Sequence, residues 1–205
     1  MLHRSNPRDA LAWVMQDIHA KGWCRGTGGN FSVVLERDPL RLLMAPSGVD
    51  KGLVAPEDLI EVDGHGQVLA GGGKASAETA LHLRIIARCG AGSVLHTHSI
   101  FNTLLSELFL PERGLELRGY EMLKGLEGIR SHETSVLLPI LPNSQDLEAL
   151  SDEAEPLLVE APYGLLIAGH GLYAWGADLF QARRHLEILE FLLELTYRRL
   201  LLERN

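Results

Sequence analysis

Cysteine is scarce in this chain, because Cys24 and Cys89 are the only two among 205 residues. Two isolated thiols cannot build a disulfide framework, and their separation matches no common zinc motif. We therefore expect both thiols to be reduced, as in a cytoplasmic protein, and we expect Cys89 to serve in packing.

Long apolar runs and an excess of positive charge are also missing. No uninterrupted apolar run approaches the roughly 20 residues that span a bilayer, which argues against a membrane partner. Residues 1–7 lack the apolar segment of a secretory signal, so we expect none. The chain has 19 Lys and Arg against 27 Asp and Glu, a formal net charge of -8. Non-specific nucleic-acid binding needs clustered positive charge, so this balance argues against a nucleic-acid partner.

What remains is the composition of a soluble globular protein, with 46% hydrophobic and 22% charged residues. The length favours one domain covering residues 1–205. Periodic apolar spacing predicts helices at 9–21, 76–89, 100–108, 144–160 and 179–203, the second with Ser76 as its N-cap. Alternating or short apolar runs predict strands at 31–35, 41–45, 59–62, 67–69, 90–98, 115–118, 135–140, 165–168 and 172–175. Hairpins mixed with helices indicate an α/β domain without strict βα repetition.

Three histidines stand where folding could bring them together. His96 and His98 lie one residue apart at the end of an apolar run, so their side chains point to the same side of an extended segment. His170 follows another apolar run and is flanked by Gly169 and Gly171, which free the local backbone. Three neutral imidazoles suit zinc and leave a coordination position open, as in a catalytic site. Imidazole also suits iron, nickel and cobalt. The remaining histidines, including His82, His132 and His185, are interpreted as structural or exposed.

A glycine-rich segment, Gly26-Thr27-Gly28-Gly29-Asn30, is the second notable motif. Its backbone N–H groups and the Thr27 and Asn30 side chains are candidate donors to an anion, although a tight turn would use the same residues. The segment lacks the Lys-Ser/Thr ending of a P-loop. Ser47, Gly48 and Ser76 are further candidate anion donors. Lys51, Lys74 and Lys124 are possible charges beside a bound anion, but we interpret them as solvated surface charges.

Two carboxylates lie near these motifs. Glu78, in the first turn of the helix predicted before His96, would complement the helix dipole. Glu121, in the segment Glu-Met-Leu-Lys-Gly at 121–125, could equally be a surface charge. Neither residue is distinctive by itself.

Taken in order, these motifs resemble the class II aldolase/adducin-head superfamily over nearly the whole chain. The matching segments are Gly-Thr-Gly-Gly-Asn at 26–30, Ser-Gly at 47–48, Ser-Ala-Glu at 76–78, His-Thr-His at 96–98 and Gly-His-Gly at 169–171. The resemblance implies a three-layer α/β/α fold around a largely antiparallel sheet. It implies one Zn2+ per subunit, held by His96, His98 and His170, and a homotetramer with active sites between subunits. It also implies a sugar phosphate whose phosphate is bound by Thr27, Gly28, Gly29, Asn30, Ser47, Gly48 and Ser76.

Within the superfamily, the segments 96–99, 121–125 and 170–176 are most similar to dehydratases that act on a methylthio-substituted pentulose phosphate. The implied activity is zinc-dependent removal of water, with Glu121 as the acid/base residue and Glu78 as a second catalytic carboxylate. Animal dehydratases place a Cys at position 78, so the division of proton transfers between Glu78 and Glu121 stays open.

Two alternatives remain beside the dehydratase hypothesis. The first is a zinc aldolase or epimerase acting on another sugar phosphate, such as fuculose-phosphate aldolase, whose relatives have a Tyr where Glu121 falls. The second is a metal-free interaction module like the adducin head. The presence of all three candidate histidines weighs against the module.

Overall fold

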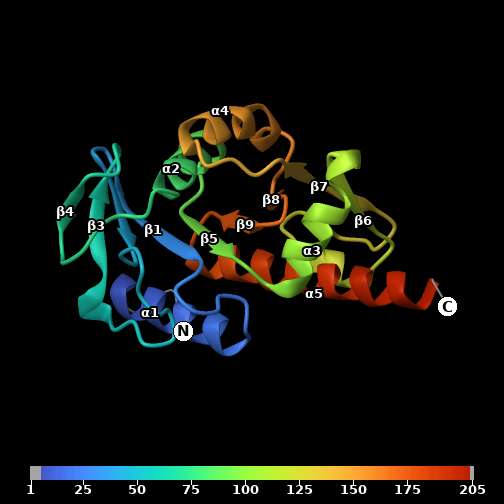
Figure 1. Cartoon of the computed structure of the whole chain (residues 1–205), viewed down its shortest axis with the longest axis horizontal. Helices are drawn as coiled ribbons and strands as arrows, with labels where there is room; N and C mark the ends of the chain where they lie inside the picture. The colour runs from blue at the N-terminus through green and yellow to red at the C-terminus, as the bar shows by residue number, and fades with distance from the viewer. Residues whose placement is uncertain (1–5, 204–205) are drawn as a thin grey trace.

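The computed structural model describes residues 6–203, in which nine strands form one sheet (Figure 1). Residues 1–5, part of the stretch in which we expect no secretory signal, lie outside the described residues. The strand order is β4-β3-β2-β1-β5-β9-β8-β7-β6. The strands are β1 Asn30–Arg37, β2 Leu40–Met44, β3 Ile60–Asp63, β4 Val68–Ala70, β5 Ser93–Thr97, β6 Gly114–Arg118, β7 Ser135–Leu141, β8 Gly164–Ile167 and β9 Gly171–Gly176. Adjacent strands pair antiparallel except β7 with β8, which confirms the largely antiparallel sheet.

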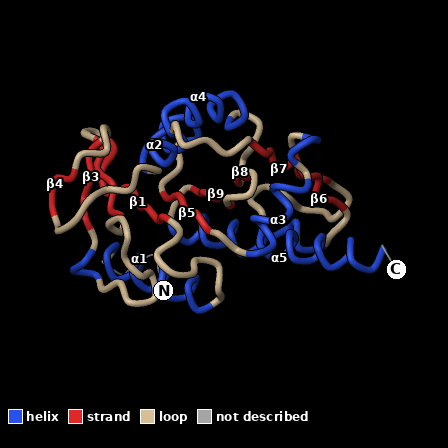
Figure 2. Tube along the Cα trace, in the orientation of Figure 1, coloured by secondary structure: helices blue, strands red, loops and turns tan. Residues whose placement is uncertain are grey.

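Helices cover both faces of this sheet, so the three-layer prediction is confirmed. The α-helices are α1 Pro7–Ala20, α2 Thr79–Cys89, α3 Ile100–Leu108, α4 Leu147–Leu158 and α5 Leu179–Glu203. Helices α2 and α4 lie together on one face, and α1 and α5 lie on the other, with the strands between the two groups (Figure 2). Short 3-10 turns occur at η2 Pro56–Asp58, η3 Leu110–Glu112 and η4 Glu121–Gly125.

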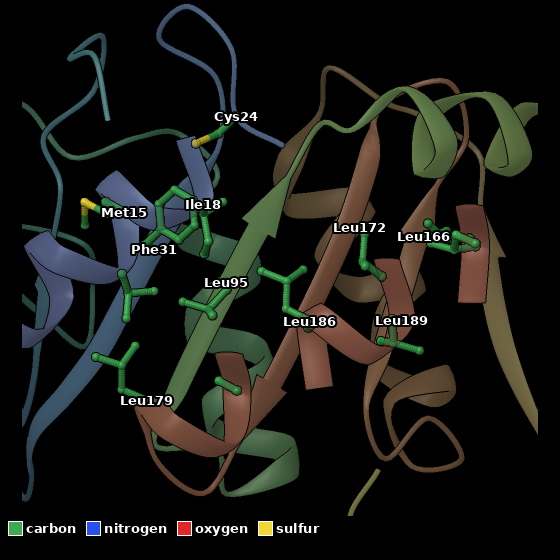
Figure 3. Packing of buried hydrophobic residues seen from close by; sticks show 14 of the residues in the cluster. Met15, Ile18, Cys24, Phe31, Leu95, Leu166, Leu172, Leu179, Leu186 and Leu189 are labelled. Atoms are coloured by element: carbon green, nitrogen blue, oxygen red, sulfur yellow. The ribbon is translucent and has the colours of Figure 1, made fainter. Parts of the chain in front are cut away.

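The larger hydrophobic core lies between the sheet and the helices α1 and α5 (Figure 3). Phe31 of β1 and Leu95 of β5 pack there with Met15 of α1 and Leu186 of α5, and all four side chains are fully buried. Burial of each such side chain stabilises the fold by about 1.5–3 kcal/mol. The core therefore fixes the central strands β1 and β5, whose ends carry the candidate site.

Two local predictions need correction. Helix α2 begins at Thr79 with Glu78 as its N-cap, so Ser76 is not the cap, although its hydroxyl accepts a hydrogen bond from the Glu78 N–H at 3.3 Å. Helix α4 is shorter than predicted because Asp146 caps it by accepting from the Ala149 N–H. The 3-10 turns η3 and η4 were not predicted.

Cys24 and Cys89 are both free, as expected. Among the described residues, none of the helices combines the length and the apolar character needed to cross a bilayer.

Candidate active site

The three candidate histidines converge where β5 ends and β9 begins. His96 is the fourth residue of β5 and is fully buried, whereas His98 lies just beyond the strand, where its N–H donates to the Trp23 carbonyl at 2.7 Å. His170 occupies the turn between β8 and β9, and Gly169 before it adopts the left-handed conformation, with φ of 63°. Because β5 pairs with β9, this turn lies beside the end of β5.

The Nε2 atoms of the three rings face a common point. Nε2 of His96 lies 2.7 Å from Nε2 of His98 and 3.4 Å from Nε2 of His170. Zn–N bonds of 2.0–2.1 Å in a tetrahedron require nitrogens about 3.3 Å apart. The His96–His170 separation matches that value, and His96 and His98 would separate by about 0.6 Å to share an ion.

Glu78 completes the cluster. Its Oε1 lies 3.0 Å from Nε2 of His170 and 3.7 Å from Nε2 of His96, and the four ligand atoms all lie within 4.8 Å of one another. The Asn30 side-chain amide donates to the other carboxylate oxygen, and the Tyr173 hydroxyl also bonds to Glu78. Burial alone would raise the pKa of Glu78, but the His170 hydrogen bond and the neighbouring imidazoles lower it to about 2. The carboxylate is therefore ionised, as a ligand or base must be.

Burial disfavours the charged form of the His96 and His98 rings, and metal binding requires neutral imidazole. Burial lowers the pKa of His96 well below its ordinary value and lowers the pKa of His98 to about 4. Nδ1 of His96 lies 3.0 Å from the Leu172 carbonyl, so Nδ1 carries the proton and Nε2 presents its lone pair. Three imidazoles and one carboxylate in this spacing have the chemistry of a divalent-metal site.

The glycine-rich segment lies against the cluster. A Cβ at Gly28 would stand 2.9 Å from Nδ1 of His98, and one at Gly29 would stand 2.8 Å from the His96 carbonyl oxygen. Only glycine lets the backbone approach this closely. The segment that ends at Asn30 therefore borders the metal site, as the anion-site hypothesis requires.

The other candidate anion donors lie on two loops that the structure joins. The Ser47 N–H donates to the Lys74 carbonyl at 2.8 Å, which places Ser47 and Gly48 beside the loop that carries Ser76. Ser76 in turn lies two residues before Glu78. Two segments distant in sequence are thus brought to one edge of the site.

The interpretation of Lys51 as a solvated surface charge is wrong. Its side chain is 1% exposed, and its ammonium donates to the Thr27 carbonyl at 2.8 Å and the Val49 carbonyl at 3.0 Å. Burial lowers its pKa, although Cys24, Asp50 and Glu78 oppose this. Lys51 links the two loops that contain Thr27 and Ser47, and no local pattern in the sequence distinguishes it from an exposed loop lysine.

Glu190 of α5 is another residue that the sequence did not single out. It is 2% exposed and accepts hydrogen bonds from Thr97 and Ser99, which flank His98. Burial raises its pKa to about 7, although these hydrogen bonds oppose the shift. A glutamate within a Leu-rich helix is ordinarily expected to be a paired carboxylate on the surface, so nothing in the sequence singles out Glu190.

Glu121 lies apart from the cluster in the single chain. It begins η4, its side chain is 67% exposed, and it pairs with Lys124 and lies 3.6 Å from Nδ1 of His132. The hydrogen bond from Lys124 lowers its pKa. The fold of the single chain therefore does not bring Glu121 into the metal cluster.

The interpretation of His82, His132 and His185 as structural or exposed residues agrees with their positions in the structure. His82 and His185 are buried, the former 2.8 Å from the Ser32 hydroxyl, and His132 is exposed.

Comparison with known proteins agrees with this geometry. A methylthioribulose-1-phosphate dehydratase of Pectobacterium atrosepticum is 46% identical over 199 residues, covering 95% of each chain. One of Yersinia enterocolitica is 45% identical and covers 96% of this chain and 93% of its own. Among solved structures, l-fuculose-1-phosphate aldolase from Thermus thermophilus superposes with a TM-score of 0.76 at 25% identity, covering all of both chains. Residues 9–197 match the Class II Aldolase and Adducin N-terminal domain. This chain therefore belongs to the class II aldolase and adducin N-terminal domain family.

Proposed function

We propose that this chain is a zinc-dependent methylthioribulose-1-phosphate dehydratase, a hydro-lyase of methionine salvage. It converts 5-methylthioribulose 1-phosphate to 2,3-diketo-5-methylthiopentyl 1-phosphate and water. The observation that carries the proposal is the convergence of three histidines and Glu78 in a chain that is similar to such dehydratases over 95–96% of its length.

His96, His98 and His170 hold the zinc ion in this proposal. Their three Nε2 atoms converge, and a three-histidine site leaves room for substrate oxygens. When bound, the ion supplies Lewis acidity that polarises a substrate oxygen. The ionised Glu78 beside it is a second catalytic carboxylate, held in place by Asn30.

Proton transfer is assigned chiefly to Glu121. Its carboxylate accepts the carbon-3 proton and returns it to the carbon-4 hydroxyl, which leaves as water. The resulting enol rearranges to the carbon-3 ketone, so the product is a 2,3-diketone. Because Glu121 is exposed and outside the cluster in the single chain, it acts in the site of a neighbouring subunit.

The substrate phosphate occupies the edge of the site formed by the glycine-rich segment and the two joined loops. Its donors are Thr27, Gly28, Gly29, Asn30, Ser47, Gly48 and Ser76. The buried ammonium of Lys51 supports this assignment, since it adds positive charge to a chain of net charge -8.

The exposed position of Glu121 also supports subunit assembly in this proposal. The chain forms one domain over residues 1–205 and assembles as a homotetramer with active sites at subunit interfaces. Exposed apolar side chains such as Phe191 and Leu202 on α5 are available for such contacts. The cytoplasmic location expected from the unpaired cysteines stays a prediction.

The direct test is a product assay. The purified protein is incubated with 5-methylthioribulose 1-phosphate, before and after chelation, and the products are identified by mass spectrometry. We expect the diketone phosphate, formed only while metal is bound. Aldol fragments or an epimer would instead favour an aldolase or epimerase, the alternative that the likeness to l-fuculose-1-phosphate aldolase supports. A protein that never binds a divalent ion would favour the interaction module.

A further inference from the structure

We propose that Glu190 is a positioning residue for the metal site: it aligns the two chain segments that carry the histidines. This inference rests on the proposed metal site and adds a residue from α5, which contributes no ligand. The argument depends on a continuous set of buried hydrogen bonds.

The carboxylate of Glu190 receives three donors in the protein interior. Its Oε1 accepts from the Thr97 hydroxyl and from the Asn102 amide, both at 2.8 Å, and its Oε2 accepts from the Ser99 hydroxyl at 2.6 Å. All four residues are buried. Thr97 and Ser99 are the immediate neighbours of His98, so Glu190 binds the side chains on both sides of that proposed ligand.

The same network reaches the third histidine through α3. Ser99 caps this helix by accepting from the Asn102 N–H, and Asn102 also donates to the Thr97 carbonyl. The next residue, Thr103, donates its hydroxyl to the His170 carbonyl at 3.1 Å. One turn later, the Ser106 hydroxyl accepts from the Gly169 N–H at 3.1 Å. The first turns of α3 therefore join the segment 96–98 to the turn at 169–170. Glu190 holds the start of α3 in place through its hydrogen bonds with Ser99 and Asn102.

The chemistry of this network favours a role beyond packing. Burying a carboxylate is costly, and an apolar side chain among apolar neighbours is often at least as stable. A carboxylate, however, accepts several hydrogen bonds at once from fixed directions. Residues that hold metal ligands in place through such bonds commonly change metal affinity by 10–100-fold when they are replaced.

Metal affinity is the informative readout, because a purely structural role would leave it unchanged. Zn2+ affinity is measured by chelator competition on Glu190→Gln, which keeps the shape but places an amide N–H2 toward the donors. We expect affinity about 10–100-fold weaker than in the wild type. The visible spectrum of bound Co2+ should shift as well, since it reports ligand geometry. Glu194→Gln is the matched control, one turn along α5 and paired with Arg198, and should change neither readout.

A second variant keeps the test decisive if Glu190→Gln does not fold. Thr103→Val retains the side-chain shape and removes the hydroxyl that donates to the His170 carbonyl and to Oδ1 of Asn102, so it should weaken Zn2+ binding by a smaller factor. If the folded variants keep wild-type Zn2+ affinity and an unchanged Co2+ spectrum, the role proposed for Glu190 is wrong, while the proposed function stands. Failure of the wild type to bind a divalent ion would contradict the proposed function and this inference together.

Discussion

At the scale of single residues, the histidines of this chain divide by what their second ring nitrogen contacts. Nδ1 of His96 bonds to the Leu172 carbonyl, which leaves Nε2 for a metal. His82, by contrast, is fully buried beside Ser32 and outside the metal cluster. A histidine is therefore a proposed metal ligand in one place and a core residue in another.

The buried His82 predicts a pH dependence of stability. Burial lowers its folded-state pKa to about 4, below the ordinary value of 6.5. As the pH falls, His82 is protonated in the unfolded chain before it is protonated in the folded chain. The free energy of unfolding present above pH 6.5 is therefore lost as the pH falls toward 4. The loss attributable to His82 is about 3 kcal/mol at 1.36 kcal/mol per pKa unit.

Chemical denaturation of the metal-free protein at several pH values measures this effect. Replacing His82 by Gln should remove about 3 kcal/mol of the decline between pH 6.5 and 4. The same substitution at His65, which is exposed in the β3–β4 turn, should leave the decline as in the wild type. Identical pH profiles for His82→Gln and the wild type would contradict this account of the core.

The buried position of Lys51 predicts that its replacement weakens substrate binding and leaves metal binding unchanged. Replacing Lys51 by Met keeps most of the length of the side chain but removes the charge and the bonds to Thr27 and Val49. Charge-assisted hydrogen bonds contribute about 1.5–3 kcal/mol, so KM for the sugar phosphate should rise about 10–100-fold.

Steady-state kinetics and metal analysis test this together. Zn2+ affinity should stay within about twofold of the wild type, and the exposed Lys74→Met should behave as the wild type in both measurements. If KM is unchanged in Lys51→Met, the buried ammonium does not support the phosphate site.

At the scale of elements, the site depends on how closely β9 approaches β5. A Cβ at Gly171 would stand 2.2 Å from the Thr97 carbonyl oxygen and 2.9 Å from Cε1 of His96. The first atom belongs to the backbone of β5, so the clash cannot be relieved by rotating a side chain. Gly171 thus sets the distance between the strand that carries His96 and the turn that carries His170.

Gly171→Ala should therefore push the two strands apart and abolish tight Zn2+ binding, with a loss of thermal stability. Gly169 supplies the control in the same turn, because its Cβ would meet nothing within 4 Å. Its positive φ means that Gly169→Ala costs about 1–2 kcal/mol of strain while the metal site survives. Equal Zn2+ affinity in both variants, measured by chelator competition, would rule out the spacing role of Gly171.

Most elements could be predicted from the sequence because their patterns are local. The alternation of β3 and the apolar stripe of α1 follow from burial on one face alone, and His96 and His170 could be associated because each follows a short apolar run. Other features depend on distant contacts. Lys51 is buried by the carbonyls of Thr27 and Val49, and Glu190 by donors about 90 residues away, which no local pattern records.

At the scale of the whole molecule, the single chain contains the proposed metal ligands but leaves Glu121 on its surface. The proposed assembly explains this arrangement, because an active site between subunits would combine His170 of one chain with Glu121 of the next. Activity would then depend on association and not on the fold of one chain alone.

Mixed oligomers test this assembly. Chains with His170→Asn and chains with Glu121→Gln should each be inactive alone. For Glu121→Gln, which lacks the acid/base residue, we expect activity about 10²–10⁴-fold below that of the wild type. After the two are unfolded and refolded together, random pairing should restore about one quarter of wild-type activity. Activity that stays at the level of the separate variants would mean that Glu121 does not complete a neighbouring site.

The most direct test of the central claim measures bound metal and turnover in the same samples. The wild type and His65→Asn, whose histidine lies outside the cluster, should each bind one divalent ion per chain and form the diketone product. His170→Asn should lose both, and wild-type turnover should vanish on chelation and return with Zn2+. If His170→Asn keeps its ion, or the chelated wild type keeps its turnover, then these histidines do not hold the metal that the reaction requires.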